Sequence, residues 1–171
     1  VLPGSFRLDA YDLQTGASAW FANGLPSEMK SGAVLDGKAV YVVGYSSPLN
    51  EPGQQPKLLP YADWRAAQDK DRDGRVTESE WKMNQAMMSA ENGLLAFRSD
   101  LAGDVTRSGF LWKHRRSVPQ LPTPVLYRGV LYMINDGGIL TTLDPGSGAV
   151  LKAGRLRDEI KRLKEMELMY A

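Results

Sequence analysis

A β-hairpin pattern that recurs along the chain sets the strongest limit on its fold. Residues 6–20 alternate apolar and polar side chains on either side of a turn at residues 14–16. Two further β-rich runs, Ala33–Leu35 and Ala39–Val43, are joined by the dipeptide Asp36-Gly37. Alternation of period two around a Gly-containing turn is typical of antiparallel hairpins, and Asp-Gly is the strongest short hairpin signal. The sequence therefore predicts a mainly β chain.

The same pattern returns after a segment of different character. Trp20 and Gly37 are 17 residues apart, as are Trp112 and Gly129, and one offset of 92 residues relates the two pairs. Between residues 50 and 92 the alternation stops and prolines and helical periodicity take over. Subtracting this segment from the offset leaves roughly fifty residues, near the length of one propeller blade, so we expect the repeat to run through an insertion.

The opening hairpin also recurs close to the other end of the chain. Asp12 and Gly16 have counterparts 132 residues later, Asp144 and Gly148, and each pair lies in a turn between apolar runs. The region Asp100–Ser108, in contrast, is polar and is expected to be a turn. We take Trp20 and Trp112 to be core residues between repeats.

These motifs carry a resemblance to a known family. The pattern L-x-A-x-D-x-x-T-G-x-x-x-W in Leu8–Trp20, and the later run Pro122–Leu151, resemble the pyrroloquinoline-quinone-like β-propeller repeat. The resemblance covers most of residues 5–155 and implies a partial β-propeller of antiparallel blade hairpins. In such a partial fold, exposed blade edges are expected to recruit protein partners or further copies of the chain.

Residues 69–80, DKDRDGRVTESE, place oxygen donors at the spacing that a calcium ion requires. Calcium takes six to eight oxygen ligands, and a twelve-residue loop supplies them from positions 1, 3, 5, 7, 9 and 12. Here those positions hold Asp69, Asp71, Asp73, Arg75 (through its carbonyl), Thr77 and Glu80. Gly74 stands at the sharp turn of position 6. The stretch resembles an EF-hand loop and predicts a Ca²⁺ site. The other interpretation is a solvated acidic turn between two helices.

Helices are expected on both sides of the loop, at Tyr61–Gln68 and from Glu78 to about Ala90, with Trp81 on an apolar face. Arg65 and Asn84 interrupt the apolar pattern of these helices. We therefore expect a structural site with a dissociation constant of about 10⁻⁴–10⁻³ M.

The expected organisation has four parts. Residues 1–50 form a propeller-type β-blade, 51–92 a linker and the EF-hand insertion, and 93–155 one or more further blades. Residues 156–171 have helical apolar spacing and are expected to form an amphipathic helix that covers a sheet face or edge. The combination of propeller repeat and EF-hand resembles bacterial extracytoplasmic proteins, which implies a periplasmic or secreted location.

Composition excludes several classes of function. The net charge is +1, so nothing suggests a nucleic-acid partner, and no apolar run is long enough to span a membrane. The absence of cysteine and the single histidine, His114, exclude thiol catalysis and a multi-histidine metal centre built by this chain alone. Because the chain begins VLPGS, without Met, we expect a fragment or a mature chain.

No catalytic or organic-cofactor residues are predicted. The expected function is calcium binding by a non-enzymatic scaffold, and exposed blade edges make an oligomer an expected form. The alternative, implied by the resemblance, is a fragment of a quinoprotein dehydrogenase.

Overall fold

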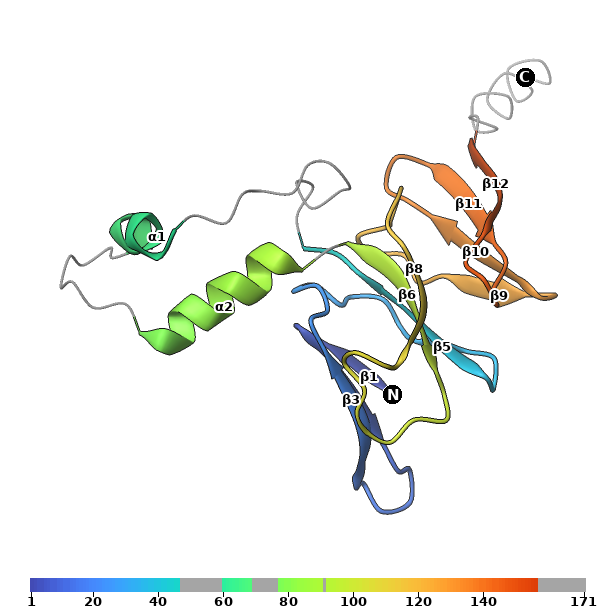
Figure 1. The fold of residues 1–171 in the computed structure, drawn as a ribbon. Helices are drawn as coiled ribbons and strands as arrows, with labels where there is room; N and C mark the ends of the chain where they lie inside the picture. Colours follow the sequence, from blue (N-terminus) through green and yellow to red (C-terminus); the bar gives the residue numbers. More distant parts are fainter. Residues whose placement is uncertain (47–59, 69–76, 91, 157–171) are drawn as a thin grey trace, which may run out of the picture.

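Three small sheets and two helices make up the part of the chain that the computed structural model describes, which is residues 1–46, 60–68, 77–90 and 92–156 (Figure 1). The mainly β prediction is confirmed. The predicted linker at residues 47–59 and the predicted C-terminal helix beyond Leu156 lie outside the described residues.

Each sheet has four strands. The N-terminal sheet has the order β1 (Leu2–Gly4), β2 (Arg7–Tyr11), β3 (Ser18–Asn23) and β7 (Gly103–Asp104). The central sheet has the order β4 (Val34–Leu35), β5 (Ala39–Gly44), β6 (Gly93–Arg98) and β8 (Phe110–His114). The C-terminal sheet consists of β9 (Val125–Tyr127), β10 (Val130–Ile134), β11 (Ile139–Leu143) and β12 (Val150–Arg155). The helices are α1 (Tyr61–Gln68) and α2 (Glu78–Ser89).

The central sheet is covered on both faces. Because side chains alternate along a strand, Val40 and Val42 of β5 pack with the N-terminal sheet, while Tyr41 and Val43 pack with the C-terminal sheet. Every residue of β5 is buried, which explains the nearly continuous apolar run at this strand. Pairing of β5 with β6 joins residues on either side of the insertion, so one sheet continues across it.

One pairing differs from expectation. The predicted polar turn Asp100–Ser108 contains a short strand, β7, which pairs with β3 in parallel. The reason lies in Val105, whose amide donates to the Phe21 carbonyl oxygen at 2.8 Å and whose side chain is buried against Trp20 and its neighbours. Val105 thus attaches this loop to the N-terminal sheet, together with Thr106, whose hydroxyl accepts from the Asn23 amide at 3.0 Å.

The central and C-terminal sheets share one internal register. Pairing across the central sheet aligns Val34, Tyr41, Ala96 and Trp112 in one row. The C-terminal sheet aligns Val125, Tyr132, Thr142 and Lys152 in the same way. We call these the tyrosine rows. The two tyrosines are 91 residues apart, one fewer than the 92 that separate the tryptophans.

A β-bulge repeats at the same place in all three sheets. Pairing shifts immediately after Ala10, which is opposite Trp20, after Ala96, which is opposite Trp112, and after Thr142, which is opposite Lys152. A bulge adds a residue to one strand and increases the local twist. Its recurrence means that the three sheets bend alike.

The turns at Asp12 and Asp144 have the same hydrogen bonds. Oδ1 of Asp12 accepts from the amide of Thr15 at 2.8 Å and from its hydroxyl at 2.7 Å. Oδ1 of Asp144 accepts from the amide and the hydroxyl of Ser147, both at 2.8 Å. The side-chain bond from the hydroxyl is the main cause of the lowered pKa of each aspartate. The two turns that these residues predict therefore share one hydrogen-bond pattern.

Trp112 links the central sheet to the second of these turns. Its indole Nε1 donates to the Pro145 carbonyl oxygen at 2.9 Å, and its ring lies 5.8 Å from that of Tyr41. A Cβ atom at Gly148 would lie 2.5 Å from Trp112 Cδ2. Trp20 is buried and stacked 6.2 Å from Phe97 of the neighbouring sheet, whereas Trp112 is partly buried. Both tryptophans therefore pack where two sheets meet, as core residues would.

Gly148 and Gly16 offer a matched test of this contact. Both have a φ of +70°, but a Cβ atom at Gly16 would meet nothing within 4 Å. We expect Gly16→Ala to lower the free energy of unfolding by about 1–2 kcal/mol through backbone strain alone. Gly148→Ala should lose a further ~1–3 kcal/mol because Trp112 is displaced. Urea denaturation measures both, and equal losses would contradict the Trp112 contact.

Candidate metal centre

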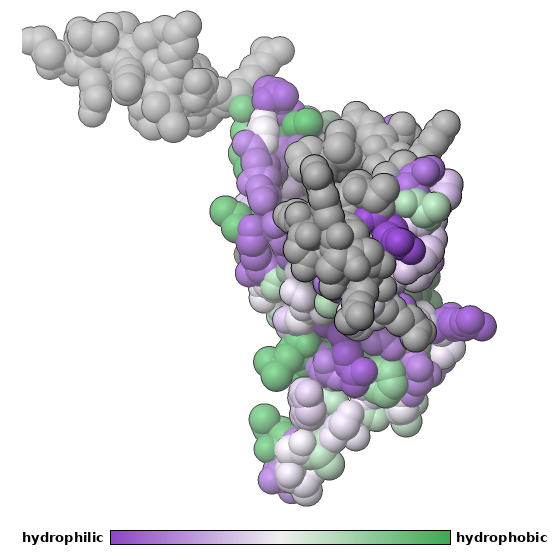
Figure 2. Space-filling model, turned by 90° about the vertical axis from the view of Figure 1, so that its left-hand side faces the viewer, coloured by the Kyte–Doolittle hydropathy of each residue, from purple (hydrophilic) through white to green (hydrophobic). Residues whose placement is uncertain are grey.

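The predicted calcium loop lies between two helices, as the sequence indicates. α1 ends at Gln68, immediately before the first predicted donor, and α2 begins at Glu78. Both predicted helices are confirmed. In Figure 1 they lie to one side of the three sheets. Viewed from that side, the coloured surface mixes hydrophilic and hydrophobic residues (Figure 2).

Two of the six predicted ligands can be placed. Thr77 is the N-cap of α2 and Glu80 is its third helical residue. The other four, Asp69, Asp71, Asp73 and Arg75, lie outside the described residues. Within the described residues, no three His, Cys, Asp or Glu side chains gather where they could hold a metal ion. The predicted ligand set therefore stays a prediction.

Thr77 and Glu80 form a capping box. The hydroxyl of Thr77 accepts from the Glu80 amide at 3.2 Å, and Glu80 Oε2 accepts from the Thr77 amide at 2.8 Å. The Thr77 hydroxyl also donates to Glu80 Oε2 at 2.8 Å. Such a box satisfies two of the unpaired amides at a helix start, and its carboxylate lies near the positive end of the helix dipole. Loop positions 9 and 12 are thereby held next to each other.

Three aromatic rings join the two helices. Trp64 of α1 lies 5.0 Å from Trp81 of α2, and Tyr61 lies 5.3 Å from Trp81 and 6.3 Å from Trp64. Trp64 is buried. Aromatic pairs at these separations add about 0.5–1.5 kcal/mol each to the burial of their surface. The contact between α1 and α2 therefore adjoins the loop, because Trp81 directly follows Glu80.

The insertion leaves and rejoins the central sheet at paired positions. Gly44, the last residue of β5, is opposite Gly93, the first residue of β6. Just beyond them, the Ser46 amide donates to Oδ1 of Asn92 at 2.7 Å, and Asn92 is 0% exposed. Glu28 and Tyr45 add an antiparallel bridge, with both N–H···O distances 2.9 Å. The two ends of the insertion are thus held together at its base.

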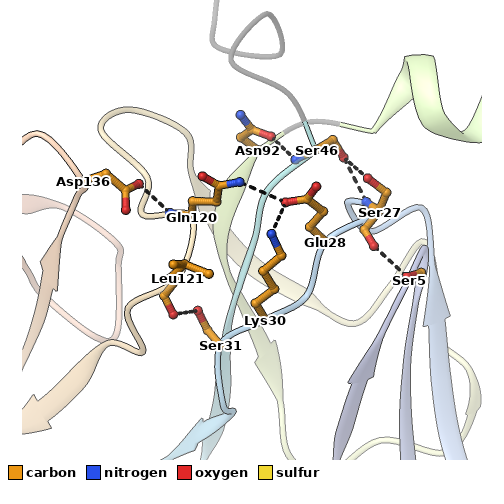
Figure 3. Close-up of polar contacts among 10 residues, drawn as sticks. All are labelled: Ser5, Ser27, Glu28, Lys30, Ser31, Ser46, Asn92, Gln120, Leu121 and Asp136. Carbon is orange, nitrogen blue, oxygen red and sulfur yellow. Dashed lines mark hydrogen bonds and ion pairs between the residues drawn. The ribbon is translucent and has the colours of Figure 1, made fainter.

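A network of polar contacts surrounds this base (Figure 3). We call it the root network, and its members are Ser5, Ser27, Glu28, Lys30, Ser31, Ser46, Asn92, Gln120, Leu121 and Asp136. Glu28 Oε2 accepts from Lys30 Nζ at 2.8 Å and from Gln120 Nε2 at 3.2 Å. These contacts, Lys30 first, lower the pKa of Glu28. The backbone amide of Gln120 in turn donates to Asp136 Oδ2 at 3.0 Å.

The root network connects all three sheets. Glu28 lies between β3 and β4, Gln120 between β8 and β9, and Asp136 between β10 and β11. These loops meet at the end of the sheets from which the insertion departs (Figure 3). The sequence carries no pattern that would indicate this network, because its members are isolated polar residues in loops far apart along the chain.

His114 has a backbone partner. Its Nε2 lies 2.8 Å from the Arg116 carbonyl oxygen, and partial burial lowers its pKa.

Comparison with known proteins adds no assignment: no protein-family model and no curated protein matches the chain. Neither described helix has the length and apolar character needed to cross a membrane.

Asn92 is the residue whose loss should loosen the base of the insertion. Asn92→Ala leaves the Ser46 amide without this acceptor, and we expect the free energy of unfolding to fall by about 1–3 kcal/mol. Asn23→Ala removes an exposed side-chain amide contact to Thr106 and should change the free energy of unfolding by less than about 0.5 kcal/mol. Chemical denaturation followed by tryptophan fluorescence measures both. Similar losses of unfolding free energy in the two variants would show that the Ser46–Asn92 hydrogen bond does not stabilise the base of the insertion.

Proposed function

We propose that this chain is a calcium-binding, non-enzymatic scaffold of the pyrroloquinoline-quinone-like β-propeller-repeat type. Calcium would brace the helix–loop–helix inserted between β5 and β6, and the sheets would present surfaces to protein partners. One observation carries the proposal. The last two donors of the twelve-residue spacing, Thr77 and Glu80, occupy the N-cap and third position of a helix, and a second helix ends just before the first donor.

The donor chemistry fits a hard cation. Asp69, Asp71 and Asp73 would supply carboxylates, Arg75 a carbonyl, Thr77 a hydroxyl acting through water, and Glu80 both of its oxygens. Four carboxylates on one short loop repel one another, and a divalent ion removes that repulsion when it binds. Folding of the loop would thereby depend on calcium, while the sheets would not.

Glu80 has a particular role in this proposal. Its Oε2 accepts from the Thr77 amide, so the carboxylate that would bind the ion also caps α2. The Thr77 hydroxyl accepts from the Glu80 amide in turn. The proposed dissociation constant is about 10⁻⁴–10⁻³ M, the range of extracellular calcium modules. A periplasmic or secreted location suits that range.

The shared bulge, the tyrosine rows and the repeated Asp turns support the propeller-repeat part of the proposal. Each sheet would correspond to one blade, stacked face to face on the next, with the calcium insertion leaving the central blade. The root network would then brace the end of the blades that carries the insertion.

Glu80→Gln separates ion binding from helix capping. The glutamine carbonyl can still accept from the Thr77 amide, so the helix content measured by circular dichroism should be retained. Loss of the charge and of bidentate ligation should weaken calcium binding by at least about tenfold, measured by isothermal titration calorimetry. The matched control is Asp63→Asn, an exposed acid in the first turn of α1, outside the loop. Calcium heats from Glu80→Gln equal to those of the control would overturn the proposed site.

A further inference from the structure

Among the residues that the structure describes, no sheet covers the outward face of the C-terminal sheet. Its inward residues Leu131, Met133 and Leu143 pack on the central sheet, so the tyrosine row of Val125, Tyr132, Thr142 and Lys152 faces the other way. Val125 is 58% exposed, and every residue of β12 is exposed. We call this surface the outer face.

In the other two sheets the corresponding face is covered by the next sheet. The Ala10–Trp20 pair of the N-terminal sheet packs against the central sheet. The tyrosine row of the central sheet packs against the C-terminal sheet. The outer face is therefore the third copy of a surface that the chain buries twice.

The covered copy shows which groups such a surface needs. The Trp112 indole Nε1 donates to the Pro145 carbonyl oxygen at 2.9 Å, and the Tyr41 hydroxyl, which lies 2.8 Å from Asp36 Oδ2, lies 3.1 Å from the same carbonyl. Pro145 belongs to the Asp144–Gly148 turn, so one carbonyl of this turn meets two polar groups of the tyrosine row. In the outer face, Tyr132 and Lys152 occupy the positions of Tyr41 and Trp112, and both can donate a hydrogen bond.

The chain carries a second, open copy of the receiving turn. The Asp12–Gly16 turn repeats the hydrogen bonds and the +70° glycine φ of the Asp144–Gly148 turn. Leu13 corresponds to Pro145, and its side chain is 100% exposed. The position of a Cβ atom at Gly16 is open, whereas at Gly148 the Trp112 ring fills it.

We propose that the outer face binds the N-terminal sheet of a second copy of this chain, head to tail. Tyr132 and Lys152 donate to the Leu13 carbonyl oxygen of the second copy, at the places that Tyr41 and Trp112 take against Pro145 within one chain. The ammonium group of Lys152 replaces the indole and is attracted by the Asp12 carboxylate of that turn, a complementarity that Trp112 does not have. Two unlike surfaces on one chain make a heterologous interface, which closes into a ring or extends. The contact does not depend on the calcium site.

Sedimentation velocity of the full 171-residue chain over a wide concentration range tests the proposal. The wild type should associate reversibly. Lys152→Glu, which repels Asp12, and Leu13→Lys, which repels Lys152, should each weaken association by at least about tenfold. The double variant should recover part of it, because the introduced lysine at position 13 attracts the introduced glutamate at position 152. Lys38→Glu, at the exposed β4–β5 turn, is the control and should associate like the wild type.

Three results would overturn the proposal: a single-chain species at every concentration, association indifferent to both single substitutions, or single variants that the double variant does not rescue. Association that appears only after removal of residues 157–171 would also overturn it, because it would assign the outer face to that segment of the same chain.

Discussion

Burial of the central sheet on both faces is the constraint on which the rest of the structure depends. Fully burying a Val, Leu or Phe side chain contributes roughly 1.5–3 kcal/mol, and β5 and β6 bury nearly all of theirs. Any additional segment must therefore enter at a strand end, where it disturbs neither packed face, and the insertion does so between Gly44 and Gly93.

The base of the insertion shows how a long excursion is tolerated. Closing a loop costs little more as it lengthens, provided that its ends are held together. The Ser46–Asn92 contact and the Glu28–Tyr45 bridge hold these ends, and the root network connects them to the neighbouring sheets. Calcium binding would then need to order only the helix–loop–helix itself. Because the sheets pack independently of the insertion, calcium is expected to act as a local brace and not as a switch that rearranges the sheets.

Local patterns in the sequence predicted the local structure well. The Asp36-Gly37 hairpin, both helices and the repeated Asp turns follow from turn chemistry and periodicity. Of the candidate site, spacing alone placed Thr77 and Glu80 at the start of α2. Their capping box adds a second role for Glu80 that the ligand pattern does not contain.

Contacts between distant segments escaped prediction, and for a physical reason. The parallel pairing of β3 with β7 accompanies the burial of Val105, an apolar residue in a mostly polar stretch without strand periodicity. The root network depends on Glu28 and Gln120, which are 92 residues apart and have no periodicity. Asn92 belongs to an Asn-Gly dipeptide, which is typical of turns, yet its side chain is buried and accepts a hydrogen bond from the Ser46 amide. Only the packing of the three sheets brings these groups together.

Terbium luminescence is the most direct test of the central claim, that residues 69–80 bind a hard cation between α1 and α2. Terbium replaces calcium at oxygen sites and emits when a nearby tryptophan is excited, and Trp81 follows Glu80 directly. If residues 69–80 bind a hard cation, we expect saturable sensitised emission that excess calcium abolishes and that Glu80→Gln strongly reduces. Emission that fails to saturate, or that calcium does not displace, would contradict it and leave the loop as a solvated acidic turn.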